Sequence, residues 1–159
     1  MIAGLPAADW MGVLEQAMEE VAGGAFGCTV VRRGRHGKPE AGMAGAYLGL
    51  VGAGGGIQIG VASTPDGCQA LSKALLGMEA DAPPLGPEEV ADAVSEIVNI
   101  LAGAVKARVR DRVPTMQMGL PTFFLGPLQP TEKLAASVAD VEVGGVATSL
   151  LLVHPRKEH

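Results

Sequence analysis

Glu96 and Asn99 place a carboxylate and a carboxamide one helical turn apart in the second half of the chain. Asp92 comes one turn earlier, and Gly103 and Lys106 continue the series at intervals of three and four residues. At about 100° per residue these positions fall within one stripe on a helix. A carboxylate, an amide that donates and accepts hydrogen bonds, and a glycine without a side chain suit the close docking of a partner. The pattern therefore predicts a polar docking site on a helix.

The helix that carries this stripe is predicted to run from Pro87 to about Arg112. Proline is favoured at the first helical position, and acidic residues near the start with basic residues near the end suit the helix dipole. Apolar residues fill the opposite side, which we expect to pack on the protein. Asn99 is a poor helix former, and Gly103 costs about 1 kcal/mol relative to alanine. Because any surface helix shows a polar stripe, an ordinary solvated face and a functional site both fit the residues alone.

Two further helices and six strands are expected around this helix. Helical spacing predicts helices over residues 7–22 and 65–77, the second capped by Thr64 and opened by Pro65. The strands are predicted at residues 26–33, 42–51, 57–63, 116–125, 137–143 and 146–153. The glycine run at 52–56 and the pair Gly144-Gly145 are expected to be hairpin loops.

The order helix, three strands, helix, helix, three strands predicts an α+β fold. It suggests an internal duplication of a helix–three-strand unit, with halves of about 1–78 and 79–159. We expect one domain over residues 1–159, with a mostly antiparallel sheet and the long helices packed on one of its faces.

The composition argues against several classes of function. A net charge of −5 and an aromatic content of 3% disfavour nucleic-acid binding, which needs clustered basic residues and stacking aromatics. The one basic run, residues 32–38, is expected to be a solvated hairpin loop. Cys28 and Cys68 lack metal-ligand spacing, and no apolar run approaches the roughly 20 residues that span a bilayer. We therefore expect a cytoplasmic protein with no membrane insertion.

The series Asp92-x-x-x-Glu96-x-x-Asn99-x-x-x-Gly103 closely resembles the signature of the CheC/CheX/FliY family of chemotaxis phosphatases. In that family Asp or Ser leads, then Glu, then Asn, and a proline follows downstream. Residues 119–126, with the sequence GLPTFFLG, resemble the strand entry at this proline. Together with the helix–three-strand repeat, the resemblance covers most of the chain.

The first helix carries a partial copy of this motif. It keeps the glutamate as Glu15 but has Met11 and Met18 in place of the aspartate and the asparagine. CheC-type members typically carry two motif copies and CheX-like members carry one, so the chain resembles the CheX-like members. Ala104 is a departure, because many relatives have a second asparagine at this position.

The resemblance implies a phosphatase that hydrolyses the aspartyl phosphate of a CheY-like response-regulator receiver and so ends a chemotaxis or other two-component signal. Asn99 would orient the attacking water, and Glu96 would pair with the receiver's active-site lysine. Asp92, Gly103 and Lys106 would support docking. The receiver would supply the Mg2+ ion, so the chain is expected to have no cofactor or metal of its own.

The resemblance also implies a homodimer, because CheX-like proteins are similar to one another in pairing through their sheets. The apolar segment 146–153 is a candidate edge for such pairing. Related flagellar switch proteins keep the fold without hydrolysis, so a non-catalytic receiver-binding or switch-like module is the alternative. The presence of both Glu96 and Asn99 favours the enzyme.

Overall fold

The computed structural model describes residues 4–126 and 131–156. Its helical segments are α1 (Ala7–Val21), the π-helical turn η2 (Ala22–Phe26), α2 (Pro65–Leu75) and α3 (Pro87–Arg108). Its strands are β1 (Val30–His36), β2 (Ala44–Gly52), β3 (Gly55–Ser63), β4 (Gln117–Met118), β5 (Thr122–Leu125), β6 (Leu134–Val143) and β7 (Val146–Pro155). Within these described ranges, no helix is both long enough and apolar enough to cross a bilayer.

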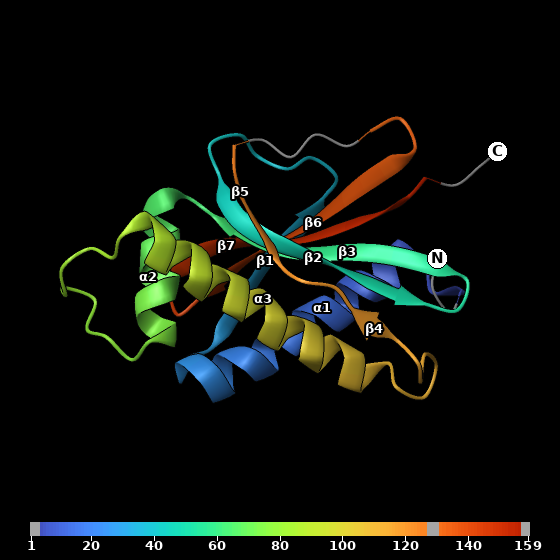
Figure 1. Cartoon of the computed structure of the whole chain (residues 1–159), viewed down its shortest axis with the longest axis horizontal. Coiled ribbons are helices and arrows are strands. Elements are labelled where there is room, and N and C mark those ends of the chain that lie inside the picture. The colour runs from blue at the N-terminus through green and yellow to red at the C-terminus, as the bar shows by residue number, and fades with distance from the viewer. Residues whose placement is uncertain (1–3, 127–130, 157–159) are drawn as a thin grey trace.

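The strands form one antiparallel sheet of seven strands, which confirms the predicted α+β class. The order is β1-β6-β7-β3-β2, and both β4 and β5 pair with β2 (Figure 1). The segment 116–125, expected to be one strand, is thus divided in two. Between the two pieces the Gly119 N–H still donates to the Gly49 carbonyl at 2.8 Å. Pro121 has no N–H to continue the ladder, so pairing resumes only at β5.

The helices cover one face of this sheet, as predicted (Figure 1). α1 and α3 contact each other, α3 lies across β2 and β3, and α1 lies over β6 and β7. Side chains that are less than 2% exposed fill the space between the layers, among them Trp10, Leu14, Leu48, Ile97 and Leu101. One side of α3 is therefore fixed in the main core.

The predicted caps and turns are confirmed. The Thr64 hydroxyl oxygen accepts a hydrogen bond of 3.0 Å from the Gly67 N–H at the start of α2. The glycine run at 52–56 contains the β2–β3 turn. Gly144 and Gly145, with φ of 56° and 83°, form the β6–β7 hairpin, because both central residues of such a turn need positive φ.

The basic run at 32–38 is strand for most of its length, so its prediction as a hairpin loop is wrong. The helical path of α1 continues through η2 to Phe26, and Gly27 ends it with a φ of 63°. The first strand therefore starts later than expected and extends through the basic residues as β1, an edge strand on β6. Charged side chains are common on edge strands, since they discourage pairing with another chain.

Two arginines of β1 point to the helices and pair with α1. A register shift between Arg32 and Gly34 places both Arg32 and Arg35 on the helical face of the sheet. There Arg32 pairs with Glu19, and Arg35 pairs with Glu15. Short-range patterns do not reveal these partners, because they lie 13 and 20 residues apart in sequence.

The segment 146–153 is not an edge. It forms β7, which lies between β6 and β3 near the middle of the sheet, so its prediction as a dimerisation edge is wrong. Its long apolar run reflects pairing on both sides and burial in the core. The edges are β1 on one side and the β4–β5 pair on the other.

The strand order relates the two halves of the chain. The first strand of each half pairs with the second strand of the other, as β1 does with β6 and β5 with β2. The third strands, β3 and β7, meet in the middle. A duplicated helix–three-strand unit would produce this order, and the duplication itself stays a prediction.

Candidate functional site

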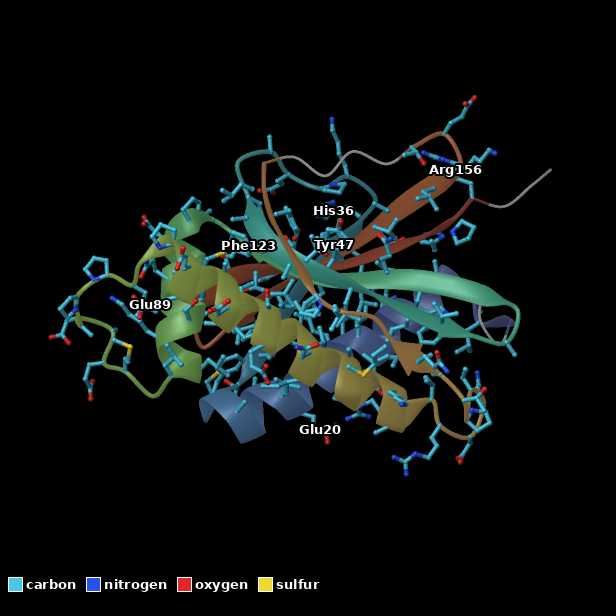
Figure 2. All side chains as sticks on the ribbon, viewed as in Figure 1. Glu20, His36, Tyr47, Glu89, Phe123 and Arg156 are labelled. Atoms are coloured by element: carbon cyan, nitrogen blue, oxygen red, sulfur yellow. The ribbon has the colours of Figure 1, made fainter. Side chains whose placement is uncertain are left out.

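The start of α3 is held by its own first turn and by the residue before it. Glu89 Oε1 accepts a hydrogen bond of 3.1 Å from the Gly86 N–H, and Pro87 follows at the first helical position. Figure 2 shows Glu89 at this end of the helix. The entry of the chain into α3 is therefore fixed locally.

The end of α3 comes earlier than the sequence predicts. Val109 and Val113 are buried, and the Val113 N–H bonds to the Val109 carbonyl at 2.8 Å. Burying both valines turns the chain out of the helix at Arg108. Arg110 and Arg112 therefore lie beyond the helix, and the polar stripe of α3 ends at Lys106.

The structure brings all the sequence-predicted site residues to the outer side of α3. Asp92, Glu96, Gly103 and Lys106 are exposed, and Asn99 is half-buried. The opposite side is buried and consists of Val90, Ala93, Val94, Ile97, Val98, Leu101, Ala102 and Val105. The site is the solvent-facing side of α3, a helix that lies over the sheet (Figure 1).

The side chains of Glu96 and Asn99 are without polar partners in the part of the chain that the structure describes. Among the residues that the structure describes, no ion pair includes Glu96 and no side-chain hydrogen bond includes either group. A carboxamide usually finds several partners when it serves the fold. Both groups are therefore available to an external partner.

Gly103 is likewise not required by the fold. A Cβ atom at this position would meet nothing within 4 Å, and the residue has ordinary helical geometry. Alanine would stabilise a helix by about 1 kcal/mol here. The bare backbone is thus consistent with a surface that something else approaches closely.

The equivalent glutamate in the first half has the opposite environment. Glu15 is only 3% exposed, and its Oε1 accepts hydrogen bonds from Arg35 Nε at 3.1 Å and from Arg35 Nη2. Met11 and Met18, its neighbours on α1, are buried in the main core. This face of α1 is therefore covered and offers no second docking surface.

The β4–β5 segment adds an apolar feature beside α3 that sequence reasoning missed. Leu120 is 89% exposed and Leu125 is 80% exposed, although β5 contacts α3 and Phe123 packs against the core (Figure 2). Leu120 directly precedes Pro121, where pairing with β2 is interrupted. The sequence contained one signal of this exposure, which is that Leu120 precedes a proline. A proline interrupts strand pairing, so the leucine beside it need not follow the alternation that buries every second residue of a strand.

The cysteines offer no nucleophile. Burial raises the pKa of the Cys28 and Cys68 thiols, so both stay protonated at neutral pH. In the described part of the chain no three His, Cys, Asp or Glu side chains gather in a way that could hold a metal ion.

Comparison with known proteins identifies the family of this fold. The family model for the chemotaxis phosphatase CheX matches residues 45–139, which is more than half of the chain. A search of curated proteins found no match. The family match includes α3 and the proline segment but not α1.

Solved structures share the whole architecture. A CheX chemotaxis protein from Desulfovibrio desulfuricans is 19% identical, with a TM-score of 0.75 over 92% of this chain and 99% of that one. The CheX–CheY–BeF3–Mg2+ complex from Borrelia burgdorferi is matched at 16% identity, with a TM-score of 0.68 over 94% of this chain and 99% of that one. FliY from Thermotoga maritima is 11% identical, with a TM-score of 0.65 over 96% of this chain and 92% of that one. At these identities the likeness shows the fold.

The contrast between the two glutamates predicts opposite effects on stability. We expect Glu15→Ala to lower the free energy of unfolding by about 2 kcal/mol, because it removes charged hydrogen bonds at a buried position. Glu96→Ala is the matched control and should change it by less than about 0.5 kcal/mol. Urea denaturation followed by circular dichroism measures both. Equal losses of unfolding free energy in Glu15→Ala and Glu96→Ala would contradict the different environments of the two glutamates.

Proposed function

The chain belongs to the chemotaxis phosphatase CheX family, and on that premise we propose that it hydrolyses the aspartyl phosphate of a CheY-like receiver domain. The observation that carries this proposal is the pair Glu96 and Asn99, both turned outward on α3 without partners among the described residues. The Borrelia burgdorferi relative, in complex with CheY, BeF3 and Mg2+, supports a receiver of this kind as the partner.

Asn99 is the residue that we propose to orient the attacking water. Hydrolysis of a phosphoryl group needs a water in line with the breaking bond, while cations stabilise the equatorial oxygens. The protein has little covalent chemistry to perform, so positioning dominates. The carboxamide oxygen can accept a hydrogen bond from the water, and its NH2 group can donate one to a neighbouring oxygen. A rigid helix holds this amide at a fixed place.

Glu96 is the proposed anchor. Its exposed carboxylate precedes Asn99 by one turn, so it can pair with the active-site lysine of a receiver while Asn99 enters the same site. Asp92, Gly103 and Lys106 extend the docking surface along the stripe. We add Leu120 as an apolar contact beside it, because an almost fully exposed leucine is a natural contact for a docked protein.

The Mg2+ ion is proposed to come from the receiver. The Borrelia burgdorferi complex contains CheY together with Mg2+. The outer side of α3 carries the exposed carboxylates Glu88, Asp92 and Glu96 at intervals of four residues, and within the described residues they form no cluster that could hold a metal ion. Carboxylates spaced along a stiff helix are a poor cage for an ion that prefers six ligands in octahedral geometry.

We also propose that the chain forms a homodimer through the helix-free face of the sheet. On that face the rings of Tyr47 and Phe124 lie 6.1 Å apart, and Tyr47 joins Leu134 and Leu151 in lining a cavity of about 140 Å3. Tyr47, Phe124 and Leu134 are half-buried on this face, while Leu151 is buried, and apolar side chains that no helix covers favour association. Sedimentation equilibrium should give the dimer mass, and a monomer at all concentrations would exclude this pairing.

The alternative is a receiver-binding or switch-like module without turnover. The fold is shared with FliY, so architecture does not separate the two functions. Ala104 is the observation that favours the alternative, since many relatives have a second asparagine there. Both motif residues are present on the outer side of α3, with Glu96 exposed and Asn99 half-buried, which favours hydrolysis.

The loss of the Asn99 amide should remove catalysis and leave the fold intact. With a panel of phosphorylated receivers in Mg2+, we expect the wild type to accelerate phosphate loss from its cognate receiver. Asn99→Ala should return the decay to that of the receiver alone while still binding it. Gln58→Ala, which removes an exposed amide from the other face of the sheet, is the matched control and should stay active. Binding without acceleration by the wild type would establish the non-catalytic alternative.

Reversal of the Glu96 charge should weaken docking. Glu96→Lys would place a cation against the receiver's lysine, and like charges brought together across an interface cost several kcal/mol. We expect at least a tenfold rise in the dissociation constant for the phosphorylated receiver, measured by calorimetry. Glu40→Lys makes the same charge change on the β1–β2 connection and serves as control. Equal affinities for both variants would show that Glu96 is not the anchor.

A further inference from the structure

A buried lysine lies at the end of α2, away from the α3 face. Lys73 is 9% exposed, and its Nζ donates hydrogen bonds to the carbonyl of Ala82 at 2.6 Å and to that of Ala80 at 3.3 Å. Both acceptors belong to the connection between α2 and α3. An ammonium group has three donors, so these two bonds leave one donor for a further acceptor.

No carboxylate of residues 4–126 and 131–156 forms an ion pair with Lys73. A buried charge is normally paired, because leaving water costs several kcal/mol that neutral carbonyls only partly offset. An anion at the free donor would complete this environment.

A cavity lies beside this ammonium group. It has a volume of about 330 Å3 and is bounded by α2, η2 and the β6–β7 turn, with Lys73 and Ala80 in its wall. Small-molecule pockets span about 300–1,000 Å3, and an engineered apolar cavity of about 150 Å3 holds benzene. The space is therefore sufficient for a small organic molecule.

The lining of the cavity restricts the chemistry of a ligand. Most of the wall is apolar, with contributions from Phe26, Leu71, Met78 and Val146. Lys73 supplies one positive charge, and Asp66, which is exposed, is the other charged residue in the wall. A phosphate dianion would find one cation and a repelling carboxylate. A monoanion with an apolar body fits both the charge and the walls.

The cavity also adjoins the connection that leads to α3. Gln69 Nε2 donates to the Leu85 carbonyl at 2.8 Å, and the Leu85 N–H donates to Gln69 Oε1 at 2.9 Å. Leu85 directly precedes the Gly86 cap of α3. Lys73 and Gln69, both in the cavity wall, thus hold the middle and the end of this connection against α2.

We propose that this cavity is a binding site for a small monocarboxylate with an apolar body, whose carboxylate accepts a hydrogen bond from Lys73 Nζ. The apolar part lies against Phe26, Leu71 and Met78. The bound molecule contacts the residues that fix the start of α3. This site is separate from the Glu96 and Asn99 face and does not depend on the proposed hydrolysis.

Octanoate is a suitable probe. Its control is 1-octanol, which has an apolar chain of the same length but no charge. By calorimetry with the full chain, we expect saturable octanoate binding and at least tenfold weaker binding of octanol. Lys73→Met should weaken octanoate binding at least tenfold. Lys38→Met removes an exposed lysine from the β1–β2 connection and should leave it unchanged.

A second variant tests the site independently, in case Lys73→Met does not fold. Ala70→Phe adds bulk from an exposed wall position of α2 and keeps the lysine, so it should abolish binding with an unchanged circular dichroism spectrum. Absence of saturable binding to the wild type would overturn the proposal. Equal binding of octanol and octanoate, or wild-type affinity in a folded Ala70→Phe, would do the same.

Discussion

The burial of one side of α3 determines where every proposed site residue lies. The helix turns about 100° per residue, so the apolar side chains from Val90 to Val105 that enter the core also set the direction of Glu96 and Asn99. A shift of one residue in this packing would carry the Asn99 amide toward the core, where an unpaired polar group costs about 1–3 kcal/mol. The geometry of the site is thus maintained by hydrophobic contacts on the opposite face.

The two halves use the same residue type in opposite ways. Glu15 is buried and joined to Arg35 of β1, whereas Glu96 is exposed and has no partner among the described residues. The difference lies in the edge strand beside each helix. β1 carries arginines that reach over α1, while β4 and β5 are short and are interrupted at Pro121. α1 is therefore joined to its edge strand by ion pairs, whereas the outer side of α3 stays exposed.

The sequence predicts what depends on local spacing. The position of α3, the stripe from Asp92 to Lys106, the Thr64 cap and the Gly144-Gly145 turn all follow from short-range chemistry. The two errors about the sheet edges concern features that depend on distant partners. The basic strand β1 needs α1 and β6, and the central place of β7 needs β3. Periodicity contains no information about which strands become neighbours, so the edge of the sheet was assigned wrongly.

A solvent-facing helix side suits a reaction whose other parts belong to a partner. In the proposed reaction, the phosphate, its metal ion and the lysine are the receiver's, so the chain has only to hold one amide and one carboxylate in place. Each ångström of freedom in α3 would lower the effective concentration of the amide at the phosphorus. The helix resists such motion through its buried side and through a start held by Glu89 and by the Gln69–Leu85 pair. Contacts far from Asn99 can therefore govern how well it is placed, because positioning is its whole contribution.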